Sequence, residues 1–113
     1  MKQVFYTRQS LLQFEENVQQ LVERGYFGEE DYAVDYMREI FRYFALNLEN
    51  SVAVKAPEFF NRYQVDGREL FYVRYRKSSQ TTWYAFFEEL EDKYSIVYLG
   101  NNKFIGHLLN ISL

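Results

Sequence analysis

The 113-residue sequence predicts an α+β domain in which an antiparallel sheet is covered on one face by two helices. Two observations support this fold class. In the first half of the chain, apolar residues recur at steps of three and four, as they do along one face of a helix. After Asn50 the pattern changes to β-branched and aromatic runs separated by short polar segments, which is typical of strands. The predicted order of elements is therefore β-α-α-β-β-β.

The first strand and the first helix are predicted within the first 25 residues. Residues 2–6 form a β-favourable run, and Thr7, with Ser10 as the alternative, is a suitable N-cap for a helix that Gly25 ends. The apolar stripe of this helix comprises Leu11, Phe14, Val18, Leu21 and Val22. Glutamine and glutamate residues fill its other face, so the helix should pack on one side only.

The second helix is expected to begin at the acidic residues 29–31 and to run to about Asn50. Carboxylates at this end are favourable because they face the positive end of the helix dipole. The apolar stripe is broad, and it comprises Ala33, Met37, Ile40, Phe44 and Leu48, widened by Tyr36, Phe41 and Tyr43. This helix should therefore be buried over a wide arc.

Three strands follow, predicted at residues 69–77, 81–90 and 94–99. The connections between them, residues 78–80 and 91–93, are short, so adjacent strands should be antiparallel. A further strand at Phe59 to Tyr63 is an open alternative, and Asp66-Gly67 offers a tight turn. The sheet ends at Gly100-Asn101-Asn102, and Lys103 to Leu113 forms either a short terminal helix or an edge segment.

The faces of this sheet depend on where the turns lie. With two-residue turns at 79–80 and 92–93, the helix-covered face collects Phe71, Val73, Tyr75, Tyr84, Phe86, Val97 and Leu99, with Glu88 as its one charged residue. The opposite face collects Tyr72, Arg74, Arg76, Trp83, Phe87, Glu89, Ile96 and Tyr98. A one-residue change in either loop would exchange the faces of a whole strand. The acidic run Glu88, Glu89, Glu91 and Asp92 is expected to be a solvated strand end.

Composition limits the functional classes. The chain has no Cys and one His, so the usual thiolate and imidazole ligand sets of a metal site cannot be assembled, and we expect neither a metal nor a cofactor. No membrane span or signal segment is predicted, and the expected location is cytoplasmic. The net charge of −3 argues against a strong attraction of the whole surface to nucleic acid. Residues 55–77, however, hold six basic residues against three acidic ones.

The mixed aromatic and basic face is the candidate binding surface. Tyr72, Arg74, Arg76 and Trp83, together with Lys103, are the residues predicted to bind a macromolecular target or RNA, because rings can stack on bases and guanidinium groups can pair with phosphates. The alternative is structural: the rings belong to the core, and the arginines pair with Glu89 or with the terminal segment.

The layout and three segments resemble the RelE/ParE superfamily of bacterial type II toxins. These segments are residues 70–76 (LFYVRYR), 83–87 (WYAFF) and 94–102 (YSIVYLGNN), and with the first strand and two helices the resemblance spans one domain of residues 1–113. Members of that family either cleave messenger RNA on the ribosome or inhibit DNA gyrase, and a cognate antitoxin masks them. Toxin–antitoxin pairs of this family also take part in plasmid stabilisation.

The resemblance implies two functions. The ParE-like branch, which binds DNA gyrase without cleaving RNA, is favoured because the chain is acidic and has Gly100-Asn101-Asn102 where many members carry a His followed by a basic residue. In the alternative, a metal-independent, ribosome-dependent endoribonuclease of the RelE type, Arg74 and Arg76 would stabilise transition-state charge, and Tyr98 or His107 would transfer a proton. A third alternative is a non-toxic protein-interaction module. The sequence leaves open whether the free protein forms a homodimer.

Overall fold

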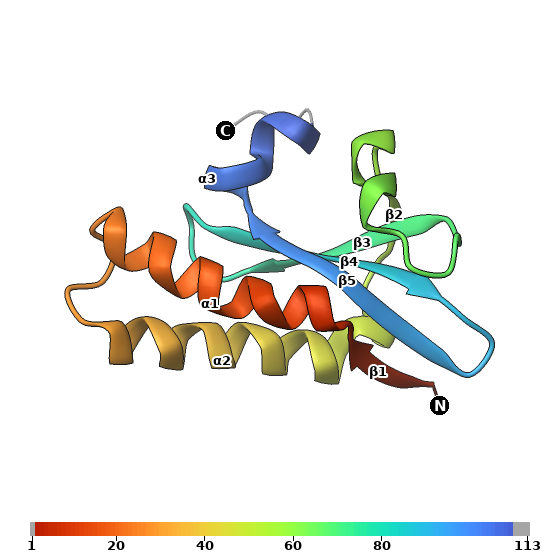
Figure 1. The fold of residues 1–113 in the computed structure, drawn as a ribbon, viewed down its shortest axis with the longest axis horizontal. Helices are drawn as coiled ribbons and strands as arrows, with labels where there is room; N and C mark the ends of the chain where they lie inside the picture. Colours follow the sequence, from red (N-terminus) through yellow and green to blue (C-terminus); the bar gives the residue numbers. More distant parts are fainter. Residues whose placement is uncertain (1, 110–113) are drawn as a thin grey trace.

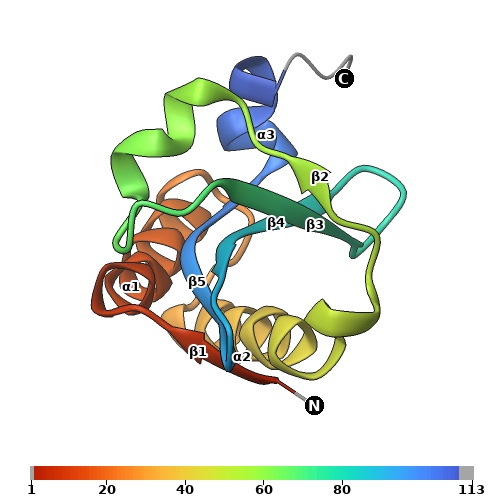
Figure 2. The ribbon, with the colours of Figure 1, turned by 90° about the vertical axis from the view of Figure 1, so that its right-hand side faces the viewer.

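The computed structural model describes residues 2–109, which form three layers with the sheet in the middle (Figures 1 and 2). Helices α1 (Arg8–Glu23) and α2 (Glu30–Asn47) lie antiparallel along one face. The other face carries shorter helical pieces, which are the 3-10 helix η2 (Glu58–Tyr63), α3 (Asn102–Ile105) and the 3-10 helix η3 (Gly106–Leu109). The predicted α+β class is confirmed.

The sheet has five strands in the order β1-β5-β4-β3-β2. They are β1 (Gln3–Tyr6), β2 (Val54–Lys55), β3 (Leu70–Arg76), β4 (Thr82–Glu89) and β5 (Lys93–Asn101). The three long strands form the predicted antiparallel meander, and the two-residue β2 adds an outer strand on the β3 side. β1 pairs with β5 in parallel, so the sheet is mixed rather than wholly antiparallel as predicted.

The two long helices form where the sequence predicts them. The Thr7 side chain caps α1 by accepting the backbone N–H of Ser10, and Gly25 follows the helix with a φ of 79°, a conformation that glycine adopts without strain. α2 ends in the 3-10 turn η1 (Leu48–Asn50), close to the expected boundary. Ala33, Met37, Ile40 and Phe44 of its predicted stripe are completely buried against the sheet.

The β3–β4 turn differs from the prediction and exchanges the faces of β4. The backbone N–H groups of Lys77 and Ser78 both donate to the carbonyl of Thr81, which gives a loop of three residues, 78–80, rather than two. Arg76 consequently pairs with Thr82. In the helix-side core, residues contributed by β4 are Trp83, Ala85 and Phe87, whereas Tyr84 and Phe86, which were predicted there, lie on the opposite face.

β5 differs from the prediction in the position of its turn and in a bulge. Leu90 N–H donates to the Lys93 carbonyl, so the β4–β5 turn is 91–92 rather than 92–93. A bulge follows, because Phe86 pairs with Tyr98 whereas Phe87 pairs with Ile96. Ile96 pairs with Phe87 and therefore follows β4 into the helix-side core, and Val97 joins the cluster on the other face. Beyond the bulge, Tyr98 and Leu99 lie on the faces predicted for them.

The second sheet face is also covered, which the prediction of a single helical layer did not include. Residues 59–63 are part of η2 rather than an extra strand, and Phe60 inserts fully buried against Phe86, with ring centroids 4.0 Å apart. The buried cluster on this face comprises Ala56, Phe60, Leu70, Tyr84, Phe86, Val97, Ile105 and Leu109. The domain therefore has a hydrophobic core on each side of its sheet.

Glu88 holds the loop that follows η2, residues 65–68, onto the sheet. Its side chain is fully buried, and its carboxylate accepts backbone N–H groups from Val65, Asp66 and Arg68 at 2.8 to 3.2 Å. Gly67, at a φ of 69°, lets this loop bend around the carboxylate. The predicted solvated strand end is thus wrong for Glu88, because three backbone donors replace its water.

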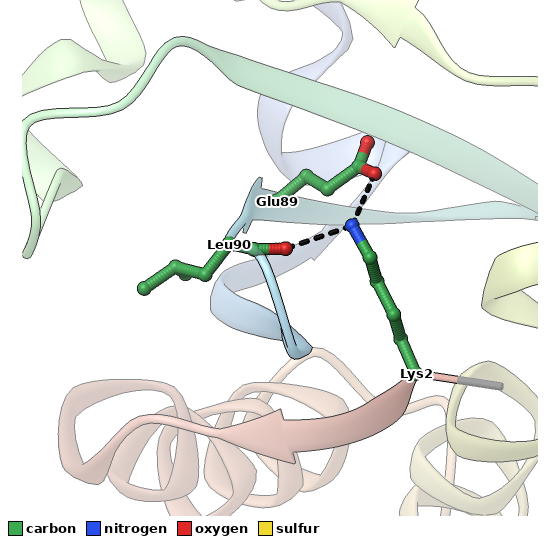
Figure 3. Close-up of polar contacts among 3 residues, drawn as sticks. All are labelled: Lys2, Glu89 and Leu90. Carbon is green, nitrogen blue, oxygen red and sulfur yellow. Dashed lines mark hydrogen bonds and ion pairs between the residues drawn. The ribbon is translucent and has the colours of Figure 1, made fainter.

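The adjacent Glu89 anchors the start of the chain. Lys2 Nζ donates to Glu89 Oε2 at 2.6 Å and to the Leu90 carbonyl at 2.8 Å (Figure 3). These contacts fasten the start of β1, which pairs with β5, to the end of β4 and to the β4–β5 turn. A further tie runs from β1 to α2, where the Tyr6 hydroxyl donates to the carbonyl of Phe41.

Candidate functional site

The arginine pair, Arg74 and Arg76, lies on the sheet face turned away from α1 and α2. Alternation along β3 places Val73 and Tyr75 in the helix-side core and the two arginines on the other face. Both side chains are exposed, and their Cα atoms are about 7 Å apart along the strand.

The arginine pair has no carboxylate partner among residues 2–109. Glu89, its alternative partner on sequence grounds, binds Lys2 instead. One guanidinium nitrogen of Arg76 donates a long hydrogen bond to the Ser79 carbonyl at 3.4 Å. The two cationic groups are therefore free to pair with an anionic partner.

Tyr72 and Tyr84 adjoin the arginine pair. Their ring centroids are 5.6 Å apart at an angle of 72°, and Tyr84 is the cross-strand neighbour of Arg74. Burial raises the pKa of the Tyr84 hydroxyl, the nearby Tyr72 raises it further, and the Arg74 guanidinium opposes them. The hydroxyl of Tyr84 is therefore protonated at neutral pH. Tyr72 is half-buried and lies beside the arginines, on the sheet face where the sequence placed it.

Trp83 is not part of this surface. It is fully buried under α2 because the three-residue loop turned β4 over, and its indole Nε1 donates to the Tyr36 hydroxyl at 3.0 Å. A ring in this position cannot stack on a base or contact a target. The prediction that Trp83 binds a target or RNA is therefore wrong.

Tyr98 lies on the same face as the arginine pair but apart from it. Register puts Phe86 between Tyr72 and Tyr98, so two strand spacings, about 10 Å, separate the latter two. Tyr98 packs against Phe60 and Tyr63, and burial, the largest cause, raises the pKa of its hydroxyl to about 12. A group that holds its proton this firmly is a poor general base near neutral pH.

The last two candidates, Lys103 and His107, lie in the segment after β5. His107 is exposed on η3, whose buried contacts come from Gly106 and Leu109. Lys103 is in α3, where its Nζ lies 4.5 Å from the ring centroid of Tyr26. Lys103 thus borders a cavity at the end of the sheet rather than the arginine pair.

This cavity, which we name the lysine pocket, has a volume of about 300 Å³. Its lining residues are Leu21, Tyr26, Phe27, Tyr36, Lys77, Ser78, Thr81, Asn101 and Lys103. They come from α1, the α1–α2 loop, α2, the β3–β4 turn, β5 and α3. Sequence reasoning missed the pocket, because no spacing along the chain indicates that two lysines and two tyrosines from such distant segments meet.

Clusters of metal-binding side chains and membrane-spanning helices were both sought in the part of the chain that the structure describes. Within residues 2–109, no three His, Cys, Asp or Glu side chains gather as they would around a metal ion. None of the helices in that range has the length and apolar character needed to cross a bilayer.

Comparison of the chain with protein-family models, with curated proteins and with solved structures finds no match in any of the three.

Proposed function

We propose that this chain is the toxin component of a type II toxin–antitoxin pair, which binds a macromolecular target through the arginine pair and Tyr72 and is neutralised by a cognate antitoxin. DNA gyrase is the target that the ParE-like resemblance implies. The observation that carries the proposal is the exposed arginine pair, which has no carboxylate partner among residues 2–109. The β-α-α order and the antiparallel meander, on which the resemblance rests, are also consistent with it.

Binding is a better account of this surface than RNA cleavage. Cleavage needs a group that accepts a proton next to the arginines, and Tyr98 is two strands away with a pKa raised by burial to about 12. Tyr84 does adjoin Arg74, but its pKa is raised as well. A binding protein requires neither group to ionise. The RelE-type endoribonuclease therefore remains the second candidate.

A groove between α1 and α2 is suited to the antitoxin. It has a volume of about 740 Å³, and its lining residues are Phe14, Glu15, Val18, Gln19, Val22, Glu23, Glu30 and Val34. The apolar floor and the three carboxylates complement an amphipathic segment with a basic edge. The groove lies on the helical layer, on the side of the sheet away from the arginine pair. An antitoxin bound there would hold the toxin in a complex and block the approach of the target sterically, without covering the arginines.

The test is induction in bacterial cells of the wild-type chain and of two double variants. Arg74→Ala with Arg76→Ala removes the arginine pair, and Arg38→Ala with Arg42→Ala is the matched control, because these exposed arginines lie on α2 in the opposite layer. We expect growth arrest and loss of plasmid supercoiling for the wild type and the control, and normal growth for the β3 variant.

The alternatives give different results in the same cells. Translation-dependent transcript cleavage that requires Arg74 and Arg76 would overturn the gyrase proposal in favour of the endoribonuclease. Normal growth on induction of a folded, soluble wild-type protein would overturn both, and would favour a non-toxic interaction module.

A further inference from the structure

The lysine pocket is separate from the surface used in the proposed function. The arginine pair projects from the sheet face away from α1 and α2, whereas the pocket lies where α2, the α1–α2 loop and α3 meet the β3–β4 turn. Its volume of about 300 Å³ is at the lower end of the range for small-ligand sites. No carboxylate is among its lining residues.

Two ammonium groups border the pocket, and they differ in how far their charge is compensated. Lys77 Nζ binds Glu39 Oε2 at 2.6 Å and lies 5.7 Å from the Tyr36 ring centroid. Lys103 Nζ lies over the Tyr26 ring and has no ion-pair partner among residues 2–109. Lys103 therefore brings the larger uncompensated positive charge to the pocket.

The Tyr36 hydroxyl adds a neutral donor. Its oxygen accepts the indole N–H of Trp83, a side chain that can only donate, so the hydroxyl proton points elsewhere. No acceptor within residues 2–109 takes that proton. Burial raises the pKa of Tyr36, so the hydroxyl keeps its proton at neutral pH and can donate it to a ligand. Ser78 and Thr81 contribute two further hydroxyl groups.

Ring surface forms the rest of the wall. Tyr26 is 44% exposed, and the rings of Phe27 and Tyr36 lie 5.2 Å apart at an angle of 53°. A ligand that satisfies this pocket must combine a flat apolar part with a compact, acceptor-rich anion. Phosphate is such an anion, and a nucleobase is such a flat part.

We propose that the lysine pocket binds one nucleoside monophosphate unit, with its phosphate at Lys103 and its base against the aromatic wall. The same chemistry occurs in a free mononucleotide and in the phosphorylated end of a nucleic-acid strand. Binding of either ligand does not require the protein to be a toxin, so it can be tested separately from the proposed function.

The test is titration of the purified protein with AMP and with UMP, followed by tryptophan fluorescence and by calorimetry. Trp83 is the only tryptophan and contacts Tyr36, so a ligand on Tyr36 should change its emission. We expect saturable binding below about 1 mM, which Lys103→Met weakens by about tenfold or more and Tyr36→Phe by about threefold or more. The matched control is Lys55→Met, which alters an exposed lysine on β2 that pairs with Glu69. This variant should bind the nucleotides as the wild type does.

The two sources of the ligand are separated by a second titration with a 5′-phosphorylated oligonucleotide and its unphosphorylated form. Tighter binding of the phosphorylated strand than of AMP, with the same dependence on Lys103, assigns the pocket to a strand end. Tighter binding of AMP assigns it to the free nucleotide. Absence of saturable binding by all these ligands, or equal weakening by Lys55→Met and Lys103→Met, would overturn the proposal.

Discussion

The indole N–H of Trp83 donates to the Tyr36 hydroxyl at 3.0 Å, and this hydrogen bond joins the centre of the sheet to the wall of the lysine pocket. Trp83 is fully buried on β4, whereas Tyr36 reaches from α2 to the pocket. The rings also contact each other, with centroids 6.0 Å apart. A core residue therefore fixes the position and the hydrogen-bonding role of a half-buried residue in the pocket wall.

Replacement of Tyr36 by Phe should destabilise the protein. The change leaves the buried Trp83 N–H without an acceptor, which costs about 1–3 kcal/mol of unfolding free energy. Urea unfolding monitored by circular dichroism measures this loss. Tyr32→Phe is the matched control on the same helix, because Tyr32 is 62% exposed, and it should leave the midpoint almost unchanged. Equal midpoints for the two variants would contradict the importance of the hydrogen bond.

The helices were predictable from sequence, but the faces of the central strand were not. Helical stripes are visible because polar residues fill the outer faces of α1 and α2. In β4, by contrast, Trp83 to Phe87 are all apolar, since both faces of the strand are buried, and no alternation indicates which side each residue takes. The faces then depend on the turn alone, and one extra residue in the 78–80 loop exchanged them.

The cover of the second face was also not predictable. Phe59 to Tyr63 has the aromatic composition of a strand, but it is part of the 3-10 helix η2, and its rings pack on Phe86 and Tyr98. Arg74 and Arg76, by comparison, were placed correctly, because they alternate with the apolar residues of β3 and one face of that strand end is exposed. Site residues were thus predictable where a strand has one polar face, and not where both faces are covered.

Replacement of Glu88 by Gln should loosen the loop of residues 65–68, which follows η2. An amide can present one oxygen but places an N–H₂ group against backbone donors, so at least one of the three hydrogen bonds is lost, at about 2–4 kcal/mol. Guanidinium unfolding gives the loss in stability, and hydrogen exchange at residues 65–68 gives its location. The neighbouring Glu89→Gln is the control, since it weakens only an exposed ion pair with Lys2 and should cost less than about 1 kcal/mol. Similar losses for both variants would contradict the clamp.

A methyl group at Gly100 should displace α3. A Cβ atom built there lies 2.9 Å from Cδ1 of Ile105 and 3.2 Å from its Cγ atoms, so Gly100→Ala should cost about 1–3 kcal/mol through overpacking. In an Ile105→Ala background the same change should cost less than about 0.5 kcal/mol, because the clashing atoms are gone. Urea unfolding of the four proteins closes this double-mutant cycle.

The control for this cycle is Gly28→Ala, since a Cβ atom at Gly28 meets no atom within 4 Å and its backbone is not left-handed. This change should be neutral or slightly stabilising. An equal cost of Gly100→Ala with and without the Ile105 side chain would show that another contact, and not the α3 packing, is responsible.

Tyr98 should make the protein lose stability in alkaline solution. Burial raises the pKa of its hydroxyl to about 12 in the folded state, whereas an unfolded tyrosine ionises near pH 10. Between these values the unfolded state binds fewer protons than the folded state, so the free energy of unfolding falls as the pH rises, by at most about 1.4 kcal/mol per pH unit from this one group. Below pH 10 the contribution is complete.

The variant Tyr98→Phe cannot ionise at this position, so its stability should fall less steeply above pH 10 than that of the wild type. Urea unfolding at intervals between pH 8 and pH 11 measures the two profiles, and the values at pH 8 serve as the internal control. Tyr6, whose pKa is also raised by burial, is present in both proteins and contributes equally to them. Parallel profiles above pH 10 would mean that the Tyr98 hydroxyl ionises as readily in the folded as in the unfolded chain, and would contradict its burial beside Phe60 and Tyr63.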